Sequence, residues 1–303
     1  MSDPVGRDPS VEGEVEYCYR HRNEATRIHC ARCGKPICPA CMIPAPVGHQ
    51  CPDCVAEARR AYRLGPARQA RRVAGTSMVR FLLIVIAAVF AVEAIKSNGQ
   101  VLSIGLSVNS SRVGRTLLDM GALVPVLVAH GQWWRLITAM FLHLSLLHIA
   151  FNAYALWLLG SLVEPAFGRI RFLLIFLVSG FMGNVASYVF GNGVGGVGAS
   201  GAVFGLLGAL VAYNLRRRSS PLAQAQLRWA AMLLVLNAVL AAGIRQIDWR
   251  AHLGGFVGGL LAGAVLEGIG SRSTRRAVQV VGTLALVGLG IVMTIAHSST
   301  IPG

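Results

Sequence analysis

The sequence at 198–215, GASGAVFGLLGALVAYNL, is almost wholly apolar, and glycines recur in it at 201, 205 and 208. A second stretch, AHLGGFVGGLLAGAVL at 251–266, carries glycines at 255, 259 and 263. Small residues at this spacing let two membrane helices approach closely. The two stretches therefore predict a tightly packed helix pair, with Ser200 at the start of one helix and His252 at the start of the other.

The composition of the whole chain agrees with a membrane protein. Of its 303 residues, 54% are hydrophobic and only 14% are charged, against roughly 25% charged in soluble domains. This excludes disorder, coiled coil, collagen and a soluble enzyme fold for the chain as a whole. We expect an all-α polytopic membrane protein with seven spans, near residues 79–95, 144–163, 172–190, 200–215, 229–244, 251–269 and 277–296.

The distribution of basic residues predicts the orientation. With the N-terminus in the cytosol, the inner segments hold 22 lysines and arginines and the outer ones hold six. Cytoplasmic loops carry this excess of positive charge, so we expect a cytosolic N-terminus and an external C-terminus. The long external loop at 96–143 is expected to pack on the bundle or lie in the interface. The composition is typical of a bacterial plasma membrane protein, and the arginines between 59 and 80 are expected to touch membrane lipid rather than nucleic acid.

Polar side chains lie near the outer ends of three predicted spans. With this orientation, Ser200, His252, His148 and Asn152 all have a similar depth in the membrane. A histidine can take the proton from a serine hydroxyl and make it a nucleophile. Asparagine, histidine and backbone N–H groups can then stabilise the oxyanion. A single serine in a membrane helix is usually hydrogen-bonded to its own helix, and a single histidine or asparagine often links two helices. Only the combination of these residues at one depth therefore indicates a catalytic site.

Together these motifs resemble the rhomboid family of intramembrane serine proteases over residues 79–296. The resemblance implies a rhomboid-like six-helix bundle with one added C-terminal span. It implies Ser200 as nucleophile, His252 as general base and acid, and an oxyanion site built by His148, Asn152 and the Ser200 N–H, with no cofactor for catalysis. Family members cleave single-span membrane proteins near the outer face, preferring a small residue before the cut. The residues that carry the rest of the resemblance, with structural roles implied, are Trp134, Arg135, His143, Glu164, Gly168, Arg171, Gly198, Gly201 and Gly255.

Trp134 and Arg135 are expected to shape the external loop, and Glu164 with Arg171 to brace the cytosolic turn. Phe204 stands where relatives often have a tyrosine under the catalytic histidine, and its ring can still pack there. Asp248, four residues before His252, either orients that histidine or caps the helix, and the cap is favoured because Asp is a preferred cap residue. Two alternative hypotheses remain. The chain could be a non-proteolytic relative that binds membrane clients through the bundle and a zinc finger in the N-terminal segment, or it could be a transporter.

All seven cysteines lie between residues 18 and 54; six form three pairs with two residues between the partners, and Cys18 has the same spacing to His21. With one histidine they offer eight ligands, the number for two tetrahedral zinc sites. A reducing cytosol and an odd cysteine count argue against disulfides. A segment of about 37 residues needs such metal links to fold, so we expect two structural zinc ions, held by Cys18, His21, Cys30, Cys33, Cys38, Cys41, Cys51 and Cys54.

This module resembles a B-box-type zinc finger, which implies that the first and third pairs share one ion and the second and fourth the other. His49 is a plausible substitute ligand, and His29 less so. The module is expected to contact a cytosolic protein partner, and nucleic acid is less expected. The predicted organisation is a disordered tail at 1–17, the finger at 18–54, a basic juxtamembrane linker at 55–78, the membrane unit at 79–296 and an external tail at 297–303.

Overall fold

The computed structural model describes residues 16–45, 47–59, 77–104, 110–191, 195–244, 247–268 and 271–301. The chain divides into two compact units, Met1–Gly75 and Thr76–Gly303, each with its own buried core. The predicted disordered tail at 1–17 and the linker at 55–78 fall mostly outside the described residues.

The first unit is a small, loop-rich module built around its cysteines. A short hairpin pairs β1 (Ile43–Pro44) with antiparallel β2 (His49–Gln50), after the 3₁₀ turn η1 (Pro39–Cys41). Residues 52–59 are helical. Six of the seven cysteines are buried and make up the core with Ile37, so the buried core of this module consists almost wholly of cysteines.

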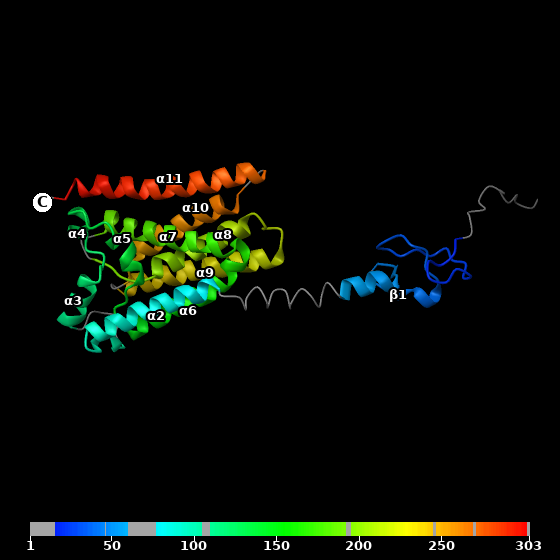
Figure 1. Ribbon diagram of the computed structural model, residues 1–303, viewed down its shortest axis with the longest axis horizontal. Helices are drawn as coiled ribbons and strands as arrows, with labels where there is room; N and C mark the ends of the chain where they lie inside the picture. The colour runs from blue at the N-terminus through cyan, green and yellow to red at the C-terminus, as the bar shows by residue number, and fades with distance from the viewer. Residues whose placement is uncertain are drawn as a thin grey trace, which may run out of the picture. The chain divides into compact units, whose positions relative to one another are not determined.

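The second unit is a bundle of helices (Figure 1). Side-chain oxygens cap several helix starts: Ser77, Ser145 and Asp248 each accept a backbone N–H of the turn that follows. Caps of this kind satisfy the free N–H groups of the first turn. The elements are α2 (Met78–Lys96), η2 (Gln100–Leu102), α3 (Ser111–Asp119), α4 (Pro125–Ala129), α5 (Arg135–Thr138), η3 (Ala139–Phe141), α6 (Leu146–Phe167), α7 (Arg169–Phe190), α8 (Ser200–Leu215), α9 (Pro221–Gly243), α10 (Trp249–Glu267) and α11 (Arg272–Ser298).

The predicted helical membrane fold is confirmed, and the chain is a multi-pass membrane protein. Among the described residues, five helices are long and apolar enough to cross a membrane: α2, α6, α7, α9 and α11. The other two predicted spans form α8, which has 16 residues, and the glycine-rich α10. Both pack against α7 and against each other, and a short span is tolerated when protein surrounds it.

Most helix boundaries differ from the expected ones by a few residues, and two of the differences matter here. The fifth predicted stretch began at residue 229, whereas α9 begins at Pro221. Proline is favoured in the first turn of a helix, where its missing N–H is not needed. At the other end of the chain, α11 continues to Ser298, so the start of the predicted external tail at 297–303 is helical.

The close pair α8 and α10 is made possible by glycine. A Cβ atom on Gly255 would lie 2.0 Å from the carbonyl oxygen of Gly201, and one on Gly259 would lie 1.9 Å from that of Gly205. Any side chain at these positions would meet backbone. The two helices therefore touch backbone to backbone, beginning one residue after Ser200.

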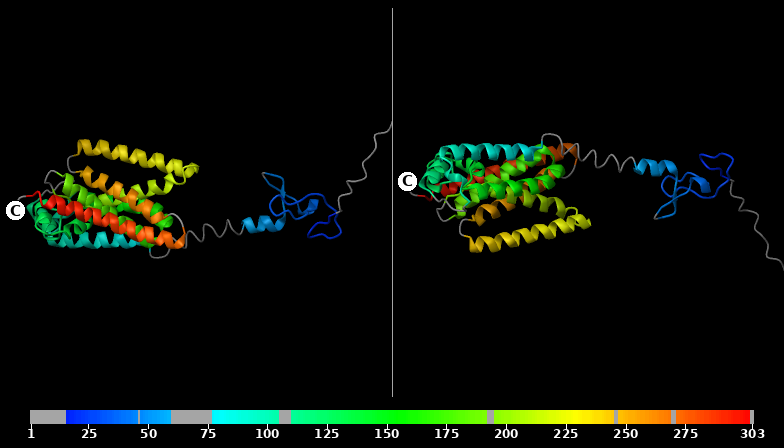
Figure 2. Two further views of the ribbon diagram at one scale, coloured as in Figure 1. Left: turned by 90° about the horizontal axis from the view of Figure 1, so that it is seen from above. Right: turned by 90° about the horizontal axis from the view of Figure 1, so that it is seen from below.

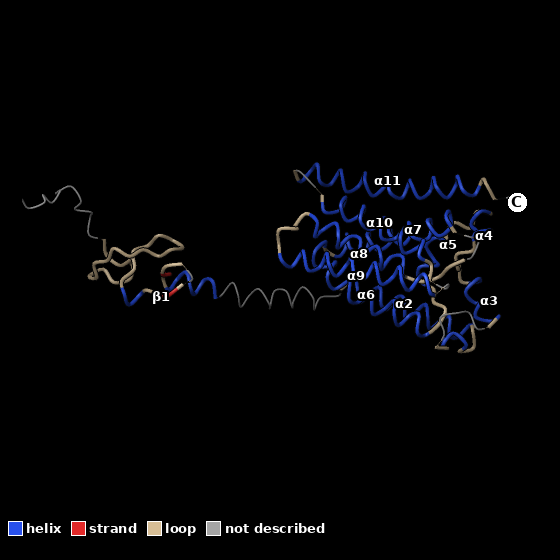
Figure 3. The backbone as a smooth tube through the Cα atoms, turned by 180° about the vertical axis from the view of Figure 1, so that it is seen from behind, coloured by secondary structure: helices blue, strands red, loops and turns tan. Residues whose placement is uncertain are grey.

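The long predicted external loop packs on the bundle. Its short helices α3, α4 and α5 gather at one end of the bundle (Figure 3). Leu123, Val128 and Leu136 of this segment form a buried cluster with Val185 and Tyr188 of α7. In contrast, α9 lies at an edge of the bundle (Figure 2), and Ala223 and Ala230 are the residues of α9 that are fully buried.

Candidate active site and metal centres

Ser200 and His252 begin neighbouring helices, at the point where α8 and α10 touch. The carbonyl oxygen of Ala251, next to His252, would lie 3.3 Å from a Cβ on Gly201, next to Ser200. Phe204, one turn beyond Ser200, stacks on the His252 ring with centroids 4.4 Å apart and planes 12° from parallel. The phenylalanine thus packs where the sequence led us to expect it, and it sets the plane of the imidazole beside the first turn of α8.

The backbone before Ser200 faces two polar side chains of α6. Gly198 has φ +127°, and a Cβ there would lie 2.8 Å from the His148 ring atoms Cε1 and Nε2 and 3.7 Å from Asn152 Nδ2. Only glycine fits this conformation and this space. The structure therefore brings His148 and Asn152 beside the loop that leads into Ser200.

Hydrogen bonds orient these two side chains as donors toward the loop. The Leu144 N–H donates to His148 Nδ1 over 3.3 Å, so a neutral His148 ring carries its hydrogen on Nε2, the atom beside Gly198. Asn152 Nδ2 donates one hydrogen to the His148 carbonyl over 3.1 Å and has a second to donate. The first turn of α8 has no side-chain cap, so its N–H groups add to the positive end of that helix.

His143 lies behind His148 and is fully buried. The two rings meet edge to face with centroids 5.2 Å apart. The His143 backbone N–H donates to the carboxylate of Glu93 over 3.1 Å, and Glu93 is itself fully buried in α2. His143 thus supports the site from outside it. Glu93 was not among the residues predicted from the sequence, although a carboxylate inside the apolar stretch at 79–95 indicates a special role.

His252 has a second neighbour that the sequence did not indicate. Its Nδ1 atom lies 3.2 Å from Oδ1 of Asn237, on α9. Asp248, the residue that the sequence suggested as an alternative partner, uses its carboxylate to cap α10 at Arg250 and Ala251 and to accept from the Ser187 hydroxyl. The cap interpretation of Asp248 therefore fits the structure.

Two further motif residues, Trp134 and Arg135, lie at the start of α5. Arg135 is buried, and its guanidinium donates to Gln132 Oε1 and to the carbonyls of Leu118 and Ala122 over 2.7–2.9 Å. It thereby ties α5 to the end of α3, while Trp134 is 57% exposed.

The expected partnership of Glu164 with Arg171 is not what the structure shows. The Glu164 carboxylate accepts from the Ser77 hydroxyl and from the N–H groups of Met78 and Val79, and its ion-pair partner is Arg169, at 4.0 Å. Because α7 begins at Arg169, this arginine is the one nearest to the end of α6. Glu164 therefore joins α6 to the start of α2.

A shallow groove between α6 and α9 is separate from this site. It is lined by Leu158, Leu162, Ala225, Gln226 and Trp229. These residues lie toward the C-terminal end of α6 and the N-terminal end of α9, whereas His148 and Asn237 lie toward the opposite ends. The groove therefore does not hold the reacting groups.

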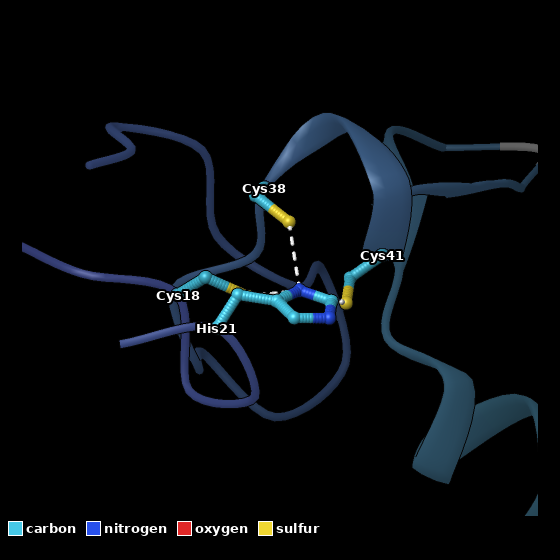
Figure 4. A group of neighbouring side chains, drawn as sticks. All are labelled: Cys18, His21, Cys38 and Cys41. Carbon is cyan, nitrogen blue, oxygen red and sulfur yellow. Dashed lines mark hydrogen bonds between the residues drawn. The ribbon is translucent and has the colours of Figure 1, made fainter. Parts of the chain in front are cut away.

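In the first unit, the eight predicted ligands form two groups of four. One group is Cys18, His21, Cys38 and Cys41 (Figure 4). The other is Cys30, Cys33, Cys51 and Cys54, and within each group the ligand atoms lie within 4.8 Å of one another. This is the cross-braced pairing that the B-box resemblance implies. His49 is in neither group: it lies on β2 opposite Pro44, and four sulfurs already complete the second set.

The donor sets fit a tetrahedral metal ion. His21 Nδ1 lies 3.2, 3.5 and 3.9 Å from the sulfurs of Cys38, Cys41 and Cys18. Bond lengths to zinc imply about 3.6 Å between such a nitrogen and sulfur. Burial raises the pKa of the Cys18 thiol, but hydrogen bonds from the backbone N–H groups of Arg20, Cys38 and His21 outweigh it and bring the pKa to about 6. In the same group, burial and the neighbouring Cys18 and Cys38 raise the pKa of Cys41 to about 11. Cys18 is thus the member of this group that is favoured as the thiolate, the form that binds metal.

Comparison with known proteins agrees with the geometry. The family model described as "Rhomboid domain" matches residues 130–268. The chain is 41% identical over 151 residues to Rhomboid protease GluP of Bacillus subtilis, covering 50% of this chain and 29% of that protein. It is 38% identical over 152 residues to RHOMBOID-like protein 1 of Arabidopsis thaliana, covering 50% and 39%. With Putative rhomboid protease YdcA of Bacillus subtilis it shares 36% identity over 135 residues, covering 44% of this chain and 67% of that one. The chain thus spans well under half the length of the first two relatives.

Proposed function

Because the chain belongs to the rhomboid family, we propose that it is an intramembrane serine endopeptidase that cleaves transmembrane protein substrates. The observation that carries the proposal is the meeting of three helix starts. Ser200 begins α8, and its neighbour Gly201 packs against Ala251, the residue before His252 on α10. Phe204 of α8 stacks on the His252 ring, and His148 and Asn152 of α6 border the backbone that leads into Ser200.

In the proposed mechanism, Ser200 Oγ attacks the carbonyl carbon of the scissile peptide bond while Nε2 of His252 takes the hydroxyl proton. The carbonyl oxygen becomes an oxyanion. Nε2–H of His148, the free Nδ2–H of Asn152 and the N–H of Ser200 donate to it, and loss of one such donor typically slows catalysis by about 10²–10³-fold.

Collapse of this intermediate breaks the peptide C–N bond, and His252 gives its proton to the leaving amine. The acyl group remains on Ser200 as an ester. Water then attacks the ester as His252 takes a proton from it, and the serine is released when that proton returns to Oγ. Every proton is carried by His252, so the chemistry needs no cofactor.

Cleavage of a labelled single-span substrate in proteoliposomes tests this proposal. We expect the wild-type protein to cut, and both Ser200→Ala and His252→Ala to lose cleavage while keeping the wild-type melting temperature. Cleavage that persists in Ser200→Ala would contradict the assignment of Ser200 as the nucleophile. A serine-directed fluorophosphonate that labels wild type but not Ser200→Ala gives a second readout, which does not depend on the choice of substrate.

The proposal includes an orientation and a location. The excess of basic residues on alternate connecting segments supports a cytosolic N-terminus and an external C-terminus. The high content of alanine, arginine and glycine is the reason for placing the chain in a bacterial plasma membrane. The Ser200–His252 dyad then lies near the outer face, where it cuts single-span substrates after a small residue. A cysteine introduced after α11, as in Ser299→Cys, and probed with an impermeant reagent tests this orientation, with the wild-type chain as the control for labelling of the N-terminal cysteines.

We assign two structural zinc ions to the N-terminal module, one to each group of four ligands. In this assignment the zinc ions fold the module, which has few apolar residues of its own, and they take no part in catalysis. The module is then free to bind a cytosolic protein partner. Elemental analysis of the purified full-length chain should give about two zinc ions per chain.

A further inference from the structure

The His252 ring is held by two contacts from two different helices. Phe204 of α8 stacks on its face, and Oδ1 of Asn237 of α9 lies 3.2 Å from its Nδ1 edge. Asn237 belongs to none of the motifs that identify the family in this sequence. It lies in the middle of an apolar stretch, and its only distinction in the sequence is that it is polar.

The chemistry of this contact fixes the protonation pattern of the imidazole. A carboxamide oxygen can only accept a hydrogen bond. Nδ1 of His252 must therefore carry the hydrogen, and in the neutral ring Nε2 is left with a lone pair. This is the tautomer that can take a proton from Ser200, because a general base must offer its lone pair to the hydroxyl.

We propose that Asn237 is the positioning residue for His252, holding it in the tautomer and orientation that proton transfer from Ser200 requires. The inference rests on the proposed protease function, in which Asn237 contacts the base and not the substrate. The expected effect is kinetic, since the bond from Asn237 strengthens when His252 becomes charged: hydrogen bonds to ionised groups are roughly twice as strong as neutral ones. An interaction of this kind changes kcat and leaves KM unchanged.

The neighbouring acid does not fill this role. The Asp248 carboxylate accepts from two backbone N–H groups and from Ser187, which holds it at the start of α10. The position of Asn237 also has a simple physical reason. A carboxamide on a membrane helix is unfavourable unless a partner satisfies it, and His252 is the partner that the structure gives it.

The test compares Asn237→Leu, which keeps the size and removes the acceptor, with Asn237→Asp, which keeps an acceptor oxygen. The matched control is Leu236→Ala, the adjacent residue on α9, whose side chain is half exposed. In proteoliposomes we expect Asn237→Leu to lower kcat about tenfold with KM unchanged. The kcat of Asn237→Asp should stay within about threefold of the wild-type value, and the kcat of Leu236→Ala should equal the wild-type value.

A second measurement reads the tautomer without any substrate. ¹⁵N spectra of histidine-labelled protein, with the His252 signals assigned by their loss in His252→Ala, should show hydrogen on Nδ1 in wild type and a mixture in Asn237→Leu. Hydrogen on Nε2 in wild type, or an unchanged kcat in Asn237→Leu, overturns the inference. If instead the spectra change as expected while the wild type cuts no substrate and takes no fluorophosphonate, the proposed function has failed and the contact stands without a catalytic role.

Discussion

Replacing Gly255 by alanine should separate the two catalytic helices. A Cβ on Gly255 would lie 2.0 Å from the carbonyl oxygen, 2.7 Å from the carbonyl carbon and 3.0 Å from the Cα of Gly201. All three atoms are backbone, so no side chain can rotate away. An ordinary contact begins near 3.4 Å, and α8 and α10 must therefore move apart by roughly 1.4 Å at this point.

Separation of α8 and α10 would also move the reacting side chains apart. Gly201 follows Ser200 directly, and Gly255 is three residues beyond His252, so the separation is transmitted to the Ser200–His252 pair. A misplacement of about 1 Å can slow an enzyme about 10²-fold. Overpacking of a core also typically destabilises by about 1–3 kcal/mol. We therefore expect Gly255→Ala to lower kcat by about two orders of magnitude and to lower the melting temperature by several degrees.

Cleavage kinetics in proteoliposomes and thermal unfolding in the same lipid would measure both effects. The control is Gly288→Ala in α11, where an added Cβ meets nothing within 4 Å. It should keep full activity and unfold no earlier than wild type, because alanine favours a helix more than glycine does. A Gly255→Ala protein that cuts at the wild-type rate would refute the claim that direct backbone contact sets the geometry of the dyad.

Three further perturbations have expected outcomes. Gly198→Ala, which combines φ +127° with a Cβ 2.8 Å from the His148 ring, should lower kcat at least tenfold, measured in the same assay; an unchanged kcat would mean that this loop can move freely away from His148. Glu164→Gln, which keeps an acceptor for the α2 N-terminus but loses its charge, should lower the free energy of unfolding by about 1 kcal/mol with little change in kcat, and a large fall in kcat would contradict its structural role. Cys38→Ser should reduce the zinc content of the full-length chain from about two ions to about one, and retention of both ions would argue against Cys38 as a zinc ligand.

The site residues that could be predicted from the sequence belong to short motifs, within a few residues of one another along the chain. Ser200 with its glycines and His252 with its own glycines each identify a helix start within a few residues, and the glycine spacing predicts that the two starts meet. The cysteine pairs of the N-terminal module are local in the same sense. Such patterns can be interpreted without knowing how distant helices cross.

Asn237 shows why the rest could not be predicted. Its partner, His252, lies on the next helix, and the contact depends on how α9 turns and tilts at the edge of the bundle. No spacing rule relates a residue in one span to a residue beyond an intervening loop. The same holds for Arg169: the identity of the partner of Glu164 depends on where α7 begins, and sequence patterns locate helix boundaries only to within a few residues.

The weak apolar packing of α9 gives the Asn237–His252 bond a meaning beyond catalysis. Within hydrocarbon, lipid tails replace apolar contacts between helices at little cost, so close packing and polar links decide how a helix is held. For α9 the close packing is limited, since Ala223 and Ala230 are its fully buried residues and both lie before the middle of the helix. The half nearer the dyad has a polar link at Asn237 instead. The contact that orients the base is therefore also a link between α9 and α10, so a displacement of α9 would disturb the base directly.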